Sequence, residues 1–128
     1  MSPFRPDHLA VISLWAEDVP ATVHFYRDVV GLSLLPHHDH PPAFDLGNDC
    51  FLVINEGQPA SVQDLKRSRF PSLAFAVKDL DEAVEHLQSH GVDLPWGIET
   101  GPEMRWFMFH DPAGNLIEFA QFDRSIHP

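Results

Sequence analysis

The sequence contains a single cysteine, Cys50, among its 128 residues. One thiol cannot form an internal disulfide, and it cannot supply the several thiolates of a cysteine-based zinc cluster. Any bound metal must therefore use histidine and carboxylate ligands. No apolar run approaches the ~20 residues needed to span a bilayer, and the opening MSPFRPDH lacks the basic and apolar regions of a signal peptide. We therefore expect a cytoplasmic protein with no membrane segment.

Basic residues are also scarce, with 8 lysines and arginines against 19 acidic residues and a formal net charge of -11. Such a field repels nucleic acid, so no nucleic-acid partner is expected, whereas it raises the local concentration of cations. The composition, 44% hydrophobic and 21% charged, is typical of a globular protein. A length of 128 residues suits one compact domain spanning 1–128.

The chain repeats one pattern. HLAVISLWAEDVPATVHFYRDVVGL, from His8, and SLAFAVKDLDEAVEHLQSHGV, from Ser72, each contain an apolar run, an aspartate, an amphipathic stretch and a glycine. Asp18 and Asp79 are expected to cap the two helices, because aspartate accepts hydrogen bonds from free amides at a helix start. The glycines at the end of each stretch are expected to stop them. The repeat therefore predicts two similar modules.

Short strand-like runs follow each predicted helix: LSLLPHH, AFDLG and CFLVIN in the first module, and WFMFH and NLIEFAQF in the second. Each half is interpreted as β-α-β-β-β, with module one at about 6–56, a linker at about 57–70 and module two at about 71–123. LPWGIETGPE is expected to form a loop at the mouth of a cleft. Two sheet-and-helix units of this kind predict an α+β fold around a small-molecule cleft.

Two segments, ATVHFYRDVVGLSLL and FHDPAGNLIEF, resemble the vicinal oxygen chelate superfamily, which includes glyoxalase I, extradiol dioxygenases, and fosfomycin and bleomycin resistance proteins. The resemblance implies a glyoxalase/bleomycin resistance/dioxygenase-like cupped sheet made of tandem βαβββ modules. It also implies a homodimer, with the cleft formed within one chain or shared between two. Members of the superfamily either perform metal chemistry or bind a drug, so the fold alone does not decide the activity.

In the metal-using members, the resemblance implies ligands on the first strand of each unit and near the end of each last strand. His8 and Glu118 match two of these positions and are the predicted metal ligands. The other two positions carry Ser72 and the Phe51 to Leu52 region, which depart from the pattern. Histidine and carboxylate donors suit iron, manganese, nickel, zinc or cobalt, so the identity of the divalent ion is open.

A third donor is needed for such a metal site. Glu56 is the predicted third ligand or general base, since an acid beside a metal-polarised carbonyl can move a proton. The alternatives are histidines of the LPHHDH run, namely His37, His38 and His40.

Three further residues are predicted to bind substrate. Trp96 lies in the expected loop over the cleft, and Phe44 is one of several aromatic residues expected to line it. Arg105 either clamps an anionic group through paired hydrogen bonds or forms a salt bridge with one of the many acids.

Two functions follow from these residues. The leading hypothesis is a divalent-metal-dependent lyase, isomerase or dioxygenase that acts on vicinal oxygens of a small substrate. The alternative is a metal-free protein that sequesters a cationic drug or metabolite, as bleomycin resistance proteins do. An interaction domain without a small-molecule ligand is a third possibility.

Overall fold

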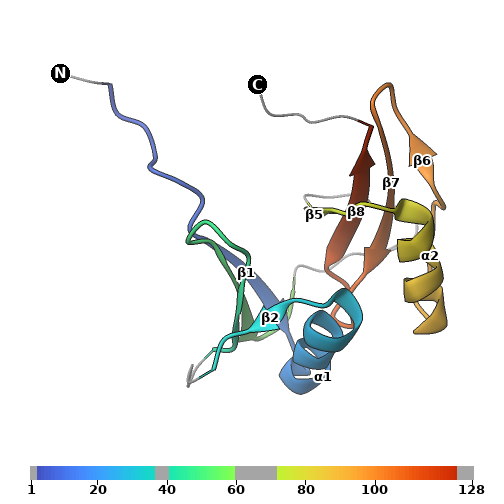
Figure 1. Ribbon diagram of the computed structural model, residues 1–128. Helices are drawn as coiled ribbons and strands as arrows, with labels where there is room; N and C mark the ends of the chain where they lie inside the picture. The colour runs from blue at the N-terminus through green and yellow to red at the C-terminus, as the bar shows by residue number, and fades with distance from the viewer. Residues whose placement is uncertain (1–2, 37–40, 60–71, 124–128) are drawn as a thin grey trace. The chain divides into compact units, whose positions relative to one another are not determined.

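The computed structural model describes residues 3–36, 41–59 and 72–123, and it divides into two compact units, Met1–Pro59 and Ala60–Pro128 (Figure 1). Each unit follows the β-α-β-β-β order that the repeat predicts. The α+β class and the tandem βαβββ architecture are therefore confirmed. His37, His38 and His40, and residues 60–70 of the predicted linker, lie outside the described residues.

The first unit contains a four-stranded sheet with the strand order β1-β4-β3-β2. Strand β1 (Val11–Ala16) pairs in parallel with β4 (Phe51–Glu56). Strand β3 (Ala43–Asp45) is antiparallel to both β4 and the short β2 (Ser33–Leu34). The parallel pair requires a crossover connection, which the helical segment between β1 and β2 begins.

That helical segment starts as predicted but changes geometry halfway. Asp18 caps α1 (Val19–His24) by accepting a hydrogen bond from the Ala21 amide. Residues Phe25–Val30 then form a π-helix, η1, which Gly31 ends at a φ of 90°. The wider π turn brings the adjacent Phe25 and Tyr26 into the core together. Of the apolar residues Val19, Val23, Tyr26 and Val30, which follow helical spacing, only Tyr26 is fully buried.

The second unit contains the sheet β5-β8-β7-β6. Strand β5 (Leu73–Ala76) pairs in parallel with β8 (Leu116–Phe122), and β7 (Met104–His110) is antiparallel to β8. The two-residue β6 (Glu99–Thr100) pairs with β7 inside the segment predicted to be a loop. A strand of this length carries no alternation that a sequence pattern can detect.

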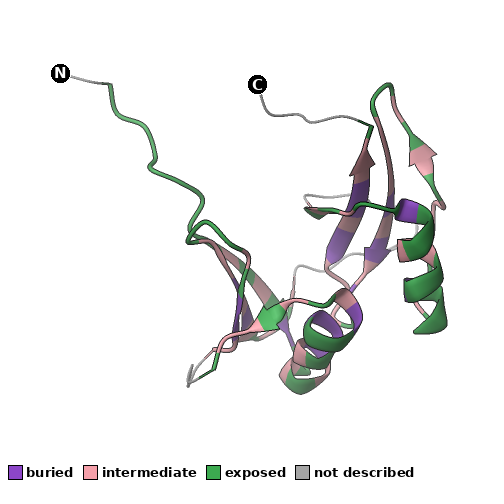
Figure 2. Ribbon diagram, viewed as in Figure 1, coloured by how far each residue is buried: buried purple, intermediate pink, exposed green. Residues whose placement is uncertain are grey.

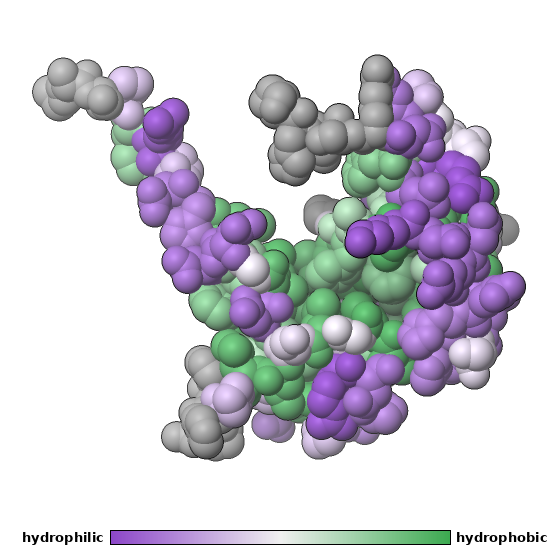
Figure 3. All heavy atoms as spheres, in the orientation of Figure 1, coloured by the Kyte–Doolittle hydropathy of each residue, from purple (hydrophilic) through white to green (hydrophobic). Residues whose placement is uncertain are grey.

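Helix α2 (Leu80–Ser89) belongs to the second unit and has the predicted cap, because Asp79 accepts a hydrogen bond from the Glu82 amide. Its buried residues are Leu80 and Leu87. Buried positions lie on β3 and β4 and the helical segment of the first unit and on β7 and β8 of the second, while α2 is mostly exposed (Figure 2). Hydrophilic atoms cover the visible sides of α1 and α2, as expected for amphipathic helices (Figure 3). Within the described ranges, no helix is long and apolar enough to cross a membrane.

Candidate functional site

Glu118 lies in the middle of β8, on the face of the second sheet that points away from helix α2. Its neighbours on the chain, Ile117 and Phe119, are buried. Gln121 lies on the same side of β8 as Ile117 and Phe119. It accepts a hydrogen bond from the Leu80 amide at the start of α2, with a donor-to-acceptor distance of 2.8 Å. Since side chains alternate along a strand, Glu118 projects from the opposite face.

The strand register identifies the residues beside Glu118. It pairs with Ala74 of β5 on one side and with Met108 of β7 on the other. In the next row, Trp106 pairs with Glu99 of β6. Trp106 is thus a diagonal neighbour of Glu118, within reach of a long or aromatic side chain. We call this surface the Glu118 face and define it by Ala74, Glu99, Trp106, Met108 and Glu118.

The electrostatic environment of the Glu118 face is negative. Glu118 is half-buried, and this burial raises the pKa of its carboxyl group above the ordinary value. The negative charge of Glu99 adds to the increase in pKa. A carboxylate in such surroundings is stabilised by any positive charge that approaches it, whether a proton, a metal ion or an organic cation. The Trp106 indole beside it offers an aromatic surface that favours cations.

The turn between β7 and β8 fixes this register. Asp111 is almost fully buried, and its side chain accepts hydrogen bonds from the amides of Ala113 and Asn115 and from the Asn115 side chain, each at 2.9 Å. Asp111 and Asn115 therefore hold the turn together. Because His110 pairs with Leu116 directly after the turn, the same hydrogen bonds set Glu118 opposite Met108.

Trp96 lies at one end of the Glu118 face. Its indole ring is 6.1 Å from the ring of His110, measured between centroids, and both residues are half-buried. The His110 Nε2 atom is buried without a hydrogen-bond partner in the described part of the chain. Burial lowers the pKa of His110, although the charges of Asp111 and Asp93 oppose this effect. A neutral imidazole therefore accompanies Trp96.

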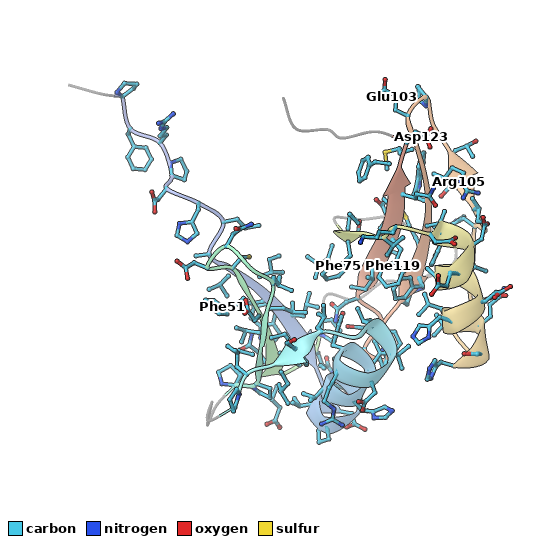
Figure 4. All side chains as sticks on the ribbon, viewed as in Figure 1. Phe51, Phe75, Glu103, Arg105, Phe119 and Asp123 are labelled. Atoms are coloured by element: carbon cyan, nitrogen blue, oxygen red, sulfur yellow. The ribbon has the colours of Figure 1, made fainter. Side chains whose placement is uncertain are left out.

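Arg105 lies on the other face of the second sheet. It alternates with Trp106 along β7, and its guanidinium Nη2 is 3.3 Å from the Asp81 carboxylate of helix α2 (Figure 4). The same nitrogen is 3.4 Å from the side-chain oxygen of Gln121. Of the two roles predicted for Arg105, anion clamp or salt bridge, the structure shows the salt bridge, with Asp81 as the partner.

In the first unit, His8 precedes the start of β1, and Glu56 is the last residue of β4, beside the end of β1. His8 precedes the first residue of the strand, has a side chain 44% exposed, and contacts Asp7 at 3.0 Å. Glu56 pairs with Ala16 at the far end. The five steps from Val11 to Ala16 alone span about 16 Å, whereas two ligands of one metal ion lie within about 4 Å of each other. Within one chain, His8 and Glu56 therefore start from backbone positions too far apart to share an ion.

Phe44 belongs to the core of the first unit. Its side chain is fully buried, it pairs with the buried Leu52, and its ring lies 6.1 Å from the Tyr26 ring of the π-helix. The side chain thus packs against the helical segment.

Among the residues that the structure describes, no group of three histidine, cysteine, aspartate or glutamate side chains is placed to hold a metal ion. Of the donors predicted from the sequence, His8 and Glu56 belong to the first unit and Glu118 belongs to the second, while His37, His38 and His40 lie outside the described residues. The residues that the sequence did not indicate are Glu99 and Met108, because their closeness to Glu118 arises from the pairing of strands distant in the chain.

Comparison with known proteins agrees with the fold and defines the class. The family model described as Glyoxalase/Bleomycin resistance protein/Dioxygenase superfamily matches residues 5–119. The chain therefore belongs to this superfamily, and the resemblance noted from the sequence is confirmed.

Solved structures with the same fold differ in function. An antibiotic-binding protein from a Streptomyces species, TnmS3, is 26% identical, with a TM-score of 0.71 over 94% of this chain and 99% of that one. An integron cassette protein from the mobile metagenome of V. cholerae is also 26% identical, with a TM-score of 0.71 over 94% and 98%. Lactoylglutathione lyase from Agrobacterium tumefaciens is 23% identical, with a TM-score of 0.69 over 91% and 94%, which reflects the fold alone.

Proposed function

We propose that this protein binds small organic cations that carry an aromatic group, without a metal ion, through the Glu118 face. The observation that carries the proposal is the presence of two acids, Glu99 and Glu118, beside the Trp106 indole on one sheet face. The carboxylates attract the positive charge, and the indole offers a flat apolar surface for the rest of the ligand. The net charge of -11 raises the concentration of cations near the protein.

The positions related to Glu118 by the internal repeat support metal-free binding. Ser72 lies seven positions before the helix cap Asp79, and Val11 lies seven positions before the corresponding cap Asp18. Neither serine nor valine is a good ligand for a divalent ion. Glu118 pairs with Ala74, five positions before Asp79.

Ser13 lies five positions before Asp18, so it corresponds to Ala74 in the repeat. Its partner on β4, Val53, is therefore the residue of the first module that corresponds to Glu118. In this cap-based alignment the three positions other than Glu118 carry Val11, Val53 and Ser72, and the predicted ligand His8 lies three residues before Val11.

The antibiotic-binding relative TnmS3 also supports a binding function. It is more similar in sequence to this chain than the lyase is, at 26% against 23% identity. We therefore propose that the physiological ligand is a cationic drug or metabolite, and that binding removes it from solution without changing it.

The test is a calorimetric titration of chelator-treated protein with the cationic glycopeptide bleomycin and with benzyltrimethylammonium. We expect saturable binding that Glu118→Gln weakens about five-fold or more, since the substitution removes one charge facing the ligand. Glu85→Gln, which removes an exposed charge on α2, is the matched control and is expected to bind as the wild type does. Absence of binding to both cations, or equal losses in the two variants, would overturn the proposal.

A metal-dependent lyase, isomerase or dioxygenase is the second candidate function. Glu118 favours it, because this residue occupies a position where the metal-using members carry a ligand, and a bound ion would polarise vicinal oxygens of a substrate. The test is metal analysis by plasma mass spectrometry on untagged protein purified without chelators. Near-stoichiometric metal that disappears in a His8→Ala, Glu118→Ala double variant would support it. Wild-type protein that holds no metal, even after incubation with iron, manganese, nickel, cobalt or zinc, would exclude it.

We also propose that the protein is a homodimer. Strand β1 lies at one edge of the first sheet, β5 lies at one edge of the second, and Val11 on β1 is 51% exposed. An exposed strand edge with apolar side chains favours association with another chain. Sedimentation velocity at working concentration is expected to give a dimer, and a monomer would refute this proposal.

A further inference from the structure

Two histidines lie close together at the end of helix α2, His86 in its last turn and His90 at its C-cap. Both residues are exposed, and their imidazole rings lie 4.9 Å apart, measured between centroids, with 63° between the ring planes. Residues four positions apart are neighbours on a helix surface, so the sequence spacing and the ring distance agree. The two imidazoles therefore form a pair that water and ions can reach.

The end of the helix fixes the backbone of this pair. Gly91 follows His90 at a φ of 75°, and its amide donates a hydrogen bond to the Gln88 carbonyl at 3.0 Å. The Val92 amide donates a hydrogen bond to the Leu87 carbonyl, also at 3.0 Å. These two hydrogen bonds form a Schellman motif, which closes the helix. The backbone positions of the two histidines are thus set before any ligand binds.

Two imidazoles at this distance suit one transition-metal ion. A zinc–nitrogen bond is about 2.0–2.1 Å long, so two nitrogens bound to one ion lie within about 4 Å of each other. The nitrogens lie on the ring edges, and rotation of the two side chains brings one nitrogen of each ring into this range. Histidines four positions apart on a helix supply two of the ligands in zinc enzymes. Because the described part of the chain contains no group of three ligand side chains, water completes the coordination.

The charges of helix α2 favour a bound cation. The carboxyl end of a helix carries a partial negative charge, and the histidine pair lies at this end. The helix sequence, LDEAVEHLQS, contains three acids and no lysine or arginine. A divalent ion held by the pair therefore meets no lysine or arginine of its own helix.

We propose that His86 and His90 form a binding site for a divalent transition-metal ion, namely copper, nickel or zinc. Imidazole is a suitable ligand for all three, and copper is expected to bind most tightly, because it forms the most stable complexes of the divalent series. The site belongs to α2 alone, so it depends neither on the Glu118 face nor on His8.

The test is a zinc titration of chelator-treated, untagged protein, followed through the side-chain signals of the histidines in NMR spectra. Zinc is diamagnetic, so these signals stay visible when the ion binds. We expect the signals of His86 and His90 to shift together and to saturate with one affinity. His86→Gln and His90→Gln should each weaken the affinity at the remaining histidine about ten-fold or more, because the second imidazole no longer binds the same ion. Both residues are exposed, so the substitutions preserve the fold, which the dispersion of the spectrum verifies.

A matched control keeps the number of histidines and moves one of them. In the double variant Gln88→His, His90→Gln, the two imidazoles are two positions apart and no longer face each other. This variant is expected to bind zinc as weakly as His90→Gln does. His24→Gln removes an exposed histidine of α1 and is expected to keep the wild-type affinity at α2. No saturable shift in the wild type, or wild-type affinity in the relocated variant, would overturn the proposal.

Metal at the histidine pair is distinguished from metal at Glu118 by the His8→Ala, Glu118→Ala double variant. This variant is expected to keep the wild-type zinc affinity at His86 and His90. Loss of that affinity would assign the ion to the Glu118 position and would overturn the site on α2.

Discussion

Glu118 and Glu99 lie on one face of the second sheet, on strands separated by β7, and the charge of Glu99 contributes to the raised pKa of Glu118. Two acids in this arrangement repel each other when no cation is present. A bound cation relieves this repulsion, so the same two residues lower the stability of the free protein and favour the ligand.

The Glu118 carboxyl should make stability fall as pH rises. Its pKa is raised in the folded state, so the folded protein binds more protons than the unfolded chain between the ordinary value and the raised one. The free energy of unfolding therefore decreases as pH increases through this window and levels off above it. Thermal unfolding of metal-free protein is expected to show a higher Tm for Glu118→Gln than for wild type at neutral pH. The difference should vanish at acid pH, and a difference independent of pH would contradict the assignment.

Asp111 should contribute strongly to stability, since it is almost fully buried and accepts three hydrogen bonds in the turn. Asp111→Ala leaves these donors unsatisfied, so we expect a loss of about 2–4 kcal/mol in the free energy of unfolding. Urea denaturation measures this loss. The exposed substitution Glu85→Ala is expected to change stability by less than about 0.5 kcal/mol. A small effect of Asp111→Ala would show that the turn holds without it.

Phe44 should affect stability and leave ligand affinity unchanged. Phe44→Leu keeps an apolar side chain but loses the packing against Tyr26, so a decrease of about 1–2 kcal/mol in the free energy of unfolding is expected. Calorimetric titration with benzyltrimethylammonium should give the wild-type affinity. Weaker binding by a fully folded variant would contradict this expectation and support the predicted substrate-binding role of Phe44.

Arg105 should have a small effect on stability, because its salt bridge with Asp81 is partly exposed to solvent. We expect Arg105→Met to lower the free energy of unfolding by less than about 1 kcal/mol. Titration of wild-type protein with benzoate tests the alternative anion clamp. No saturable binding is expected, and a benzoate affinity that Arg105→Met removes would establish the clamp.

The fold was predictable because its signals are local and occur twice. The caps at Asp18 and Asp79 and the glycine stop at Gly31 follow from single residues whose chemistry favours one backbone position. The π-helix was not predictable, since packing of Phe25 and Tyr26 in the core overrides the helical spacing of the apolar residues.

The candidate site was predictable only at Glu118. Its neighbours Glu99 and Trp106 come from strands paired across the sheet, and the two-residue β6 gives no sequence signal. The resemblance places the first-strand ligand at His8, whereas β1 begins three residues later, at Val11. Register depends on hydrogen bonds between distant segments, which a single sequence does not record.

The most direct test of the central claim is the number of protons released when chelator-treated protein binds benzyltrimethylammonium. The number is obtained by calorimetry at mildly acidic pH in two buffers of different ionisation enthalpy. If Glu118 faces the bound cation, binding lowers its raised pKa, so the wild type should release protons and Glu118→Gln should release fewer. Equal proton release by the two proteins, or no binding heat without metal, would contradict the account.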